Sequence, residues 1–317
     1  MQISRKYQNF WQNICFRSSK MASPHPYRGM KTLITRSSLY DPLNDFLFYK
    51  VMGEKGDEVQ LLGFINAVLG KTGDDKFTSI EILEDKTFTP EKIGDKSVTL
   101  DVRAVLHGKT KVNVEVQLRN EHNMDKRSLF YWSEEFVKSL KKGQDYIELP
   151  DVIAISIVDF DYINTSSFHS CFHLRDDNER DVILTNSLEI HFINMVKYRK
   201  MKGRLNDSLS RWLTWFDRNS TPELLEEVLK MDNAIQTANE RLLYVTGDED
   251  AQREYLVRFR AMCDMTSMQN AAHREGVKEG IAQGREERRE EILKLFEQGL
   301  SVDEIKERLK RQITDNK

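Results

Sequence analysis

Two neighbouring segments with alternating side chains constrain the fold of this chain more than any other feature. Residues 97–106 carry an apolar side chain at every second position, and residues 111–118 do the same. His107, Gly108 and Lys109 separate them, and a glycine there supplies the positive φ that tight hairpin loops need. Alternation with period two is typical of strands buried on one face. The two segments are therefore predicted to form an antiparallel hairpin.

The segments around this hairpin alternate between strand and helix patterns. Residues 152–160 form a short β-branched run that is typical of a buried strand. Further strands are predicted at residues 80–89, 168–174 and 188–196. Helices are predicted from about Asp41, from about Asp57, and over residues 123–142, 206–216, 222–231, 233–245 and 252–298, with a last helix after Ser301. This order predicts the α/β class: a mixed sheet flanked by helices, followed by an α-helical C-terminal region.

Capping and periodicity give two more local predictions. Asp41 and Pro42 suit the N-cap and first position of the first helix. In the helix over residues 123–142, an apolar stripe at helical spacing is predicted to face the core. Its members are Leu129, Trp132, Phe136 and Leu140.

The polar face of the predicted hairpin contains two acids. If Leu106 lies opposite Thr110, the polar pairs are Thr99 with Gln117, Asp101 with Glu115 and Arg103 with Asn113. Directly opposed side chains have Cβ atoms about 4.5–5.5 Å apart. Two carboxylates at that distance both stay ionised only when a cation or a strong donor lies between them.

Three interpretations of this face remain open on residue types alone. It is a solvated sheet face on which Arg103 neutralises the acids, or a divalent metal site with oxygen ligands, or a retaining glycosidase pair, which needs carboxyl groups about 5–5.5 Å apart. Carbohydrate sites usually have aromatic platforms nearby, and this face has none.

A resemblance to a known family bears on this choice. Asp101 followed, on the next strand, by Glu115-Val116-Gln117 resembles the signature of the PD-(D/E)XK nuclease superfamily. The surrounding blocks resemble the family of recombination-promoting nucleases and transposases within it. These blocks are DPLNDFLF at 41–48, LDVRA at 100–104, VNVEVQL at 112–118, KRSLFYWSEEF at 126–136, LKKGQDY at 140–146 and VIAISIVDF at 152–160. The resemblance extends over roughly residues 33–310.

The resemblance implies a restriction-endonuclease-like fold and a DNA endonuclease that depends on Mg²⁺ or Mn²⁺, linked to recombination and mobile elements. It implies that Asp101 and Glu115 hold the metal, and that Gln117 takes the place of the superfamily lysine. An amide orients water but carries no charge, so Lys126 or Arg127 is predicted to supply the missing cation. The alternative is a catalytically weak or inactive relative that binds nucleic acid or protein.

Two further residues are candidates at the same site. Asp45 is a candidate third acidic ligand or water base, and the alternative is ordinary exposure in a first helical turn, where the helix dipole favours an acid. Lys96 is a candidate phosphate contact, and the alternative is a solvated lysine at a strand end. Tyr131, one helical turn after Arg127, is expected to pack against it.

Charge and composition set the remaining expectations. The net charge is −3, but the first forty residues carry seven basic and no acidic side chains, so the rest of the chain stands at −10. No stretch has the roughly 20 apolar residues of a membrane span. The resemblance implies an intracellular, cytoplasmic and DNA-associated protein. A homo-oligomer through the C-terminal helices is a further prediction. The predicted regions are a disordered basic arm (1–32), a nuclease core (33–200), a helical extension (201–250) and a charged long helix with a terminal hairpin (251–317).

Three residues of the strand predicted at 168–174 form a second constellation. His169, Cys171 and His173 alternate, so they are expected to share one face. A structural zinc site usually needs four ligands, and no fourth is evident along the chain. Half-buried strand residues are therefore the favoured interpretation. The three cysteines of the chain are far apart, which argues against a disulfide framework.

Overall fold

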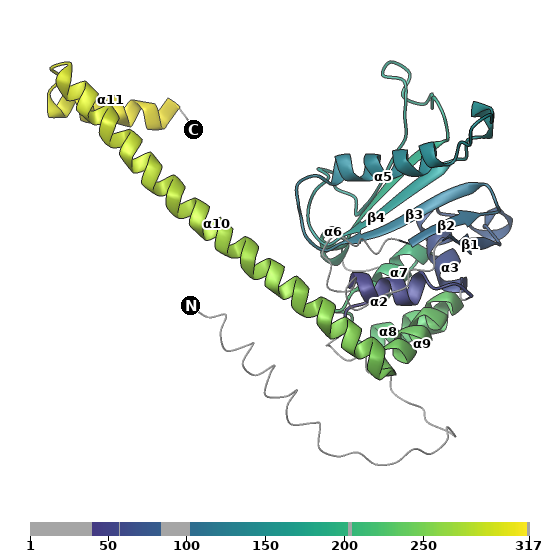
Figure 1. Cartoon of the computed structure of the whole chain (residues 1–317). Coiled ribbons are helices and arrows are strands. Elements are labelled where there is room, and N and C mark those ends of the chain that lie inside the picture. Colours follow the sequence, from purple (N-terminus) through teal and green to yellow (C-terminus); the bar gives the residue numbers. More distant parts are fainter. Residues whose placement is uncertain (1–39, 57, 84–101, 202–204, 316–317) are drawn as a thin grey trace, which may run out of the picture. The chain divides into compact units, whose positions relative to one another are not determined.

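The computed structural model describes residues 40–56, 58–83, 102–201 and 205–315, with side chains up to residue 308. All of them belong to one of two units of the chain, Arg36–Lys317. Within these residues a six-stranded mixed sheet has helices on both faces (Figure 1). The predicted arm at residues 1–32 lies outside the described residues. The predicted region boundaries stay predictions.

The sheet has the strand order β1-β2-β3-β4-β6-β5. Its strands are β1 (Ile80–Ile82), β2 (Val102–Leu106), β3 (Thr110–Gln117), β4 (Val152–Val158), β5 (His169–Phe172) and β6 (Leu188–Asn194). β1, β2 and β3 are antiparallel, β3, β4 and β6 are parallel, and β5 runs antiparallel to β6. β4 is buried along its whole length, as its continuous apolar run predicts for a central strand.

The helix α5 (Met124–Lys138) connects β3 to the parallel strand β4 and lies across one face of the sheet (Figure 1). The predicted apolar stripe is wrong for its first member, because the Leu129 residue is 49% exposed. Phe130 and Val137 are exposed as well, at 61% and 69%. The buried residues of α5 are instead Met124, Ser128 and Glu135. The predicted stripe does reach the core at Trp132, which packs against the apolar cluster around Phe192. Ser128 and Glu135 are buried where the sheet face is polar.

The opposite face of the sheet carries the larger apolar core. Helices α2 (Asp45–Met52), α3 (Val59–Val68) and α7 (Ser208–Phe216) meet there, and α8 (Pro222–Met231) and α9 (Asn233–Gly247) pack behind them. The ring centroids of Phe64 and Phe216 are 5.3 Å apart, and those of Phe64 and Trp212 are 5.7 Å apart. Gly63 permits the close approach of α3 and α9, since a Cβ there would lie 2.5 Å from that of Ala234. The helices after residue 200 therefore share a core with the first two helices.

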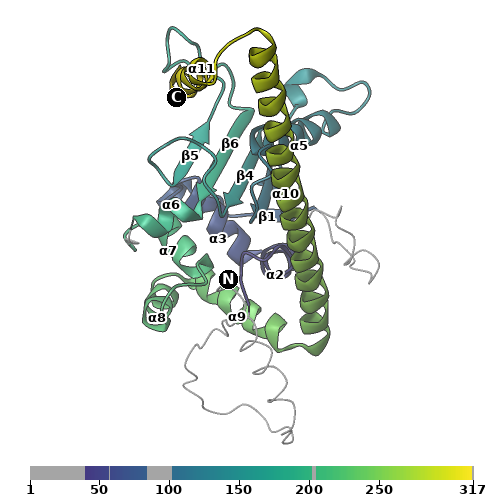
Figure 2. The ribbon, with the colours of Figure 1, turned by 90° about the vertical axis from the view of Figure 1, so that its left-hand side faces the viewer.

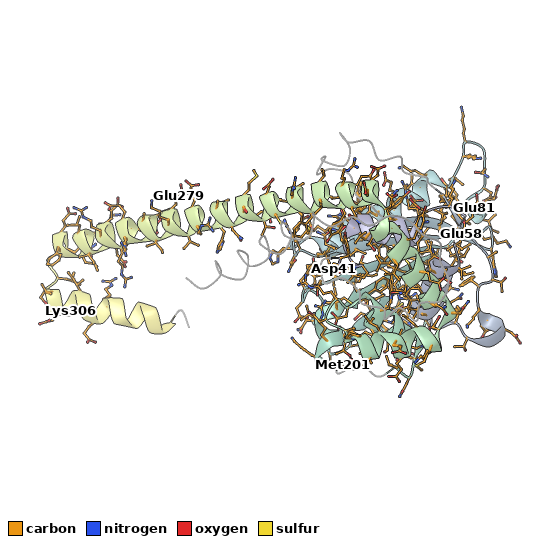
Figure 3. The ribbon with its side chains drawn as sticks, turned by 90° about the horizontal axis from the view of Figure 1, so that it is seen from below. Asp41, Glu58, Glu81, Met201, Glu279 and Lys306 are labelled. Atoms are coloured by element: carbon orange, nitrogen blue, oxygen red, sulfur yellow. The ribbon has the colours of Figure 1, made fainter. Side chains whose placement is uncertain are left out.

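The C-terminal region is helical, as predicted. The short α6 (Met195–Lys200) follows β6, and α10 (Glu249–Glu297) precedes α11 (Val302–Asp315). Only Tyr255 and Leu295 are buried among the 49 residues of α10. Glu279 on α10 and Lys306 on α11 extend into solvent (Figure 3). No helix within the described residues is both long and apolar enough to cross a membrane.

Two boundaries of the first elements differ from prediction. α2 begins at Asp45 with Asn44 as its N-cap, because the Asn44 side chain accepts hydrogen bonds from the amides of Phe46 and Leu47. Asp41 caps only the preceding turn, where its Oδ1 accepts from the Leu43 amide at 3.0 Å. Residues 84–89 and 97–101, parts of the first two predicted strands, lie outside the described residues, as does Asp57.

Candidate active site

The register of the predicted hairpin is confirmed for its described part. Leu106 lies opposite Thr110, Arg103 opposite Asn113 and Val102 opposite Val114. His107 and Gly108 both have positive φ in the loop, at 47° and 68°. Asp101 and Lys96 lie outside the described residues, so the facing pair of carboxylates stays a prediction.

Glu115 is buried under α5 together with its neighbour on the same face. Glu115 is only 3% exposed and Asn113 only 4%. The interpretation as a solvated sheet face is therefore wrong for these two positions, since a helix covers them. A buried carboxylate is stable only when charge or hydrogen bonds compensate for the lost hydration. The side chains of α5 supply that compensation.

Arg127 is the cation that α5 brings to Glu115. Its Nη2 lies 2.5 Å from Oε1 of Glu115, and its Nη1 lies 3.5 Å from Oε2 of Glu121. The guanidinium also stacks on Tyr131, 5.5 Å from the ring centroid. These contacts hold the positive charge of Arg127 against the sheet at Glu115. The expectation that Tyr131 packs against Arg127 is confirmed.

The beginning of α5 is itself anchored, which sets the position of Arg127. The Tyr162 hydroxyl donates to Oδ1 of Asp125 at 2.6 Å, and this bond lowers the pKa of the Asp125 carboxyl. Met124 is fully buried in the apolar cluster that includes Val158 and Phe192. Met124 thus holds the first turn of α5 against the sheet, and Asp125 holds it against the loop after β4.

A second ion pair lies on the same face. Glu135, also on α5, accepts from Nη1 of Arg103 at 2.8 Å and lies 3.5 Å from Nζ of Lys111. Sequence analysis did not predict this partner of Arg103, and the predicted neutralisation of Asp101 by Arg103 stays a prediction, because Asp101 lies outside the described residues. Ser128 and Ser156 share a hydrogen bond of 3.2 Å on the same face, and Ser156 is aligned with Glu115 in the neighbouring strand. Sequence reasoning missed Glu135, although it lies two turns after Arg127 on one face of the helix.

Gln117 and Lys126 are less buried. Gln117 ends β3, and its Nε2 donates to the carbonyl oxygen of Arg119 at 3.2 Å. Lys126 is exposed in the first turn of α5. The structure therefore brings Arg127, rather than Lys126, into contact with Glu115.

Asp45 is engaged by a residue far along the chain. Its Oδ2 accepts from Nε and Nη2 of Arg258 on α10, at 2.9 and 2.7 Å. Arg119, just after β3, donates to the Met262 carbonyl and to Thr266 on the same helix. α10 therefore runs beside both ends of the candidate site. Sequence analysis did not predict this contact, although apolar residues recur at helical spacing on either side of Arg258.

The constellation on β5 is larger than predicted. Cys171 lies opposite His191 of β6, and Glu189 reaches the same group, so two more polar residues join it. Burial raises the pKa of Cys171 to about 11, with Glu189 adding to the effect, and burial lowers the pKa of His169 to about 4. The alternation of Glu189 and His191 on the neighbouring strand was the missed signal.

Comparison with known families identifies the family to which this chain belongs. The family described as PD-(D/E)XK nuclease family transposase matches residues 42–272. This chain belongs to that family. The match includes the sheet, α5 and the first part of α10. Comparison with the curated proteins and with the solved structures gives no match.

PD-(D/E)XK nucleases generally use divalent metal ions, and the described oxygen donors fit such an ion. Glu115 offers a buried carboxylate two residues from Asn113. The Oδ1 of Asn113 is buried and accepts no hydrogen bond from the described residues. Carboxylate and amide oxygens are hard ligands of the kind that Mg²⁺ and Mn²⁺ accept. Family membership and this donor set support a nuclease-like or transposase-related role.

Proposed function

We propose that the protein is a metal-dependent endonuclease that hydrolyses DNA phosphodiester bonds inside the cell, with Mg²⁺ or Mn²⁺ held by Glu115 and Asp101. The observation that carries the proposal is the buried Glu115 carboxylate with the Oδ1 of Asn113 two residues away on the same face, buried and without a hydrogen-bond partner among the described residues. Asp101 directly precedes Val102 in the chain, and Val102 pairs with Val114, the neighbour of Glu115. A link to recombination belongs to the same proposal and rests on the family.

In this proposal each side chain has its own chemical role. The divalent ion, when bound, supplies positive charge to a phosphoryl oxygen and lowers the pKa of a coordinated water. Arg127 adds a fixed cation beside Glu115, which compensates for the neutral Gln117. Since Nε2 of Gln117 is bound to the Arg119 carbonyl, its Oε1 is the atom assigned to orient water. Lys126, exposed near this end of α5, contacts the DNA backbone.

Asp45 has a positioning role in the proposal. Its carboxylate binds Arg258, and the Cβ position of Gly53, the C-cap of the same helix, lies 2.9 Å from Cγ2 of Val102. The helix that carries Asp45 is therefore packed against the strand that follows Asp101 in the sequence. Asp45 becomes a third acidic ligand only if it exchanges Arg258 for the metal.

A plasmid-nicking assay tests the proposal. Purified protein is incubated with supercoiled DNA with and without Mg²⁺, beside Asp101→Ala, Glu115→Gln and the double variant Lys126→Ala/Arg127→Ala. We expect metal-dependent nicking that falls by at least about 100-fold in each variant, the size of effect seen when a preorganised charge is removed. Glu134→Gln is the matched control, because the Glu134–Lys138 pair lies on the solvent side of the same helix.

Two results would contradict the assignment. Equal nicking by wild type and Asp101→Ala would show a contaminating nuclease. Retention of DNA in a gel-shift assay by a wild type that does not nick with any divalent ion would favour the second candidate, an inactive nucleic-acid-binding relative. The 2.5 Å pairing of Glu115 with Arg127 is the observation that favours this candidate, because a guanidinium there competes with a metal ion for the carboxylate.

A further inference from the structure

The cluster on β5 and β6 gathers a thiol, a carboxylate and two imidazoles at one edge of the sheet. In the register, Cys171 lies directly opposite His191. His173 follows Cys171 by two residues, and Glu189 precedes His191 by two residues, so side chains at these four positions share a face. Figure 2 shows β5 and β6 side by side at this edge. The chain thus brings together residues that lie about twenty positions apart in the sequence.

The ligand atoms of Cys171, Glu189 and His191 all lie within 4.8 Å of one another, as they would around one tetrahedral ion, and His173 joins the group through its contact with Cys171. Sγ of Cys171 lies 3.3 Å from Nε2 of His173, 3.7 Å from Nε2 of His191 and 3.9 Å from Oε1 of Glu189. Zinc bond lengths of about 2.3 Å to sulfur and about 2.0–2.2 Å to nitrogen and oxygen put such pairs about 3.6 Å apart. Each sulfur distance therefore needs an adjustment of only about 0.3 Å.

One pair of these groups is joined by a hydrogen bond that zinc coordination would replace. Nε2 of His191 lies 2.6 Å from Oε1 of Glu189, which is a hydrogen bond. Around a tetrahedral zinc ion the same two atoms would lie about 3.4 Å apart. A rotation of the Glu189 side chain, which is only partly buried, is sufficient to open that distance. The strand backbones need not move.

The surroundings hold the imidazoles in place. His191 is 2% exposed, and its Nδ1 lies 2.9 Å from Nε2 of His169, whose ring stacks on it at 5.1 Å between centroids. A second hydrogen bond of this kind fixes the orientation of a ligating histidine. Nδ1 of His173 is buried without a hydrogen-bond partner among the described residues. Cys171 is exposed, so an ion can enter from solvent.

We propose that Cys171, Glu189 and His191 bind one Zn²⁺ ion, with the His173 ring turning toward the ion as the fourth ligand, in a structural site that fastens the edge strand β5 to β6. A thiolate with two imidazoles and a carboxylate is a ligand set that favours zinc over Mg²⁺. Four protein ligands leave no open position for catalysis. His169 is a positioning residue that acts through His191. The site is separate from the proposed nuclease centre and does not depend on it.

Metal titration of the full-length protein tests this proposal. Protein stripped with EDTA is titrated with Zn²⁺ against a chromophoric chelator, and separately with Co²⁺, whose thiolate complex gives a charge-transfer absorption. We expect one Zn²⁺ per chain and a cobalt spectrum of tetrahedral thiolate type. Cys171→Ser and His173→Ala lose at least about 100-fold in affinity, and His169→Ala loses about 10–100-fold.

Cys263→Ser is the matched control, because Cys263 is an exposed cysteine on α10. It should bind zinc as the wild type does. The proposal is overturned if Cys171→Ser keeps the cobalt charge-transfer band, or if wild-type protein takes up no zinc in competition with the chelator. Circular dichroism of each variant shows that it is folded. His173→Ala is used instead of a His191 variant because His173 is only partly buried, whereas replacing the buried His191 could prevent folding.

Discussion

Two polar clusters occupy opposite faces of the same sheet. Glu115 is aligned with Ser156 and Ser156 with Phe192, so His191, adjacent to Phe192, points to the other face. On the first face, charged side chains of the strands form ion pairs with charged side chains of the helix α5. On the second, the polar groups come from two neighbouring strands and contact one another.

The difference lies in where the positive charge comes from. Under α5 the chain provides it: Arg127 lies on Glu115, and Arg103 and Lys111 lie on Glu135. At the β5–β6 edge, Lys71 and Arg175 act on Glu189 and Cys171 only through their electric field. The contacting atoms are sulfur, oxygen and ring nitrogen. The first cluster is therefore stable by its own charges, whereas the second is completed by a cation from solution.

The largest expected effect on stability concerns the ion pairs under α5. Glu135→Ala leaves Arg103 and Lys111 partly buried without the carboxylate between them. We expect the free energy of unfolding to fall by about 3 kcal/mol, because breaking a buried pair leaves uncompensated charge. Urea denaturation measures it. Glu134→Ala, which removes an exposed pair on the same helix, should change stability by less than about 0.5 kcal/mol. Equal midpoints for the two variants would refute the buried pairing.

The second prediction concerns the proposed zinc site on β5 and β6. At a free Zn²⁺ concentration 100 times its dissociation constant, stability should rise by about 2.7 kcal/mol. For a chain of this size, whose unfolding entropy is about 2.1 cal/mol/K per residue, that is a rise in Tm of about 4–5 °C. Differential scanning calorimetry with EDTA and with Zn²⁺ measures it. Glu115→Gln should respond to zinc as the wild type does, and Cys171→Ser should not. A zinc response lost in Glu115→Gln would show that the two clusters are not independent.

The smallest expected effect concerns the contact between α10 and α2, the helix that begins at Asp45. Arg258→Ala removes the partner of Asp45, whose side chain is 38% exposed. A loss of about 1 kcal/mol is expected, since water already screens part of the pair. Arg253→Ala, on the exposed side of the same helix, serves as its control in the same urea titration. A loss as large as that of Glu135→Ala would place Asp45 inside the buried network rather than at its rim.

Much of this architecture was predictable from local patterns. The alternation over residues 97–106 and 111–118 predicted the hairpin and its register, and the described pairs from Val102 onward confirm it. The apolar run at residues 152–160 predicted a central strand, because only a strand buried on both faces tolerates it. The family resemblance suggested Lys126 or Arg127 as the missing cation, and only the structure shows Arg127 in contact with Glu115.

Other features had no local signature. α5 buries Glu135 and exposes Leu129, which departs from hydrophobic periodicity at these two positions, whereas Trp132 packs against an apolar cluster as its periodicity predicts. A pattern of apolar residues locates a buried face only when the partner surface is apolar. Where the strands present charged side chains instead, ion pairing decides which residues of the helix are buried. The cap at Asn44 in place of Asp41 is a similar case, since either side chain can cap a turn.

The sequence by itself determined the element types, the hairpin register and the family blocks, because these depend on residues close together along the chain. Only the tertiary structure decided which distant groups meet. It placed Arg258 on Asp45, 213 positions away, and it brought Glu189 and His191 to Cys171. The physical reason is that side-chain charges and metal ligands act over a few ångströms in space. Their partners are therefore set by strand order and helix packing, which no short stretch of sequence contains.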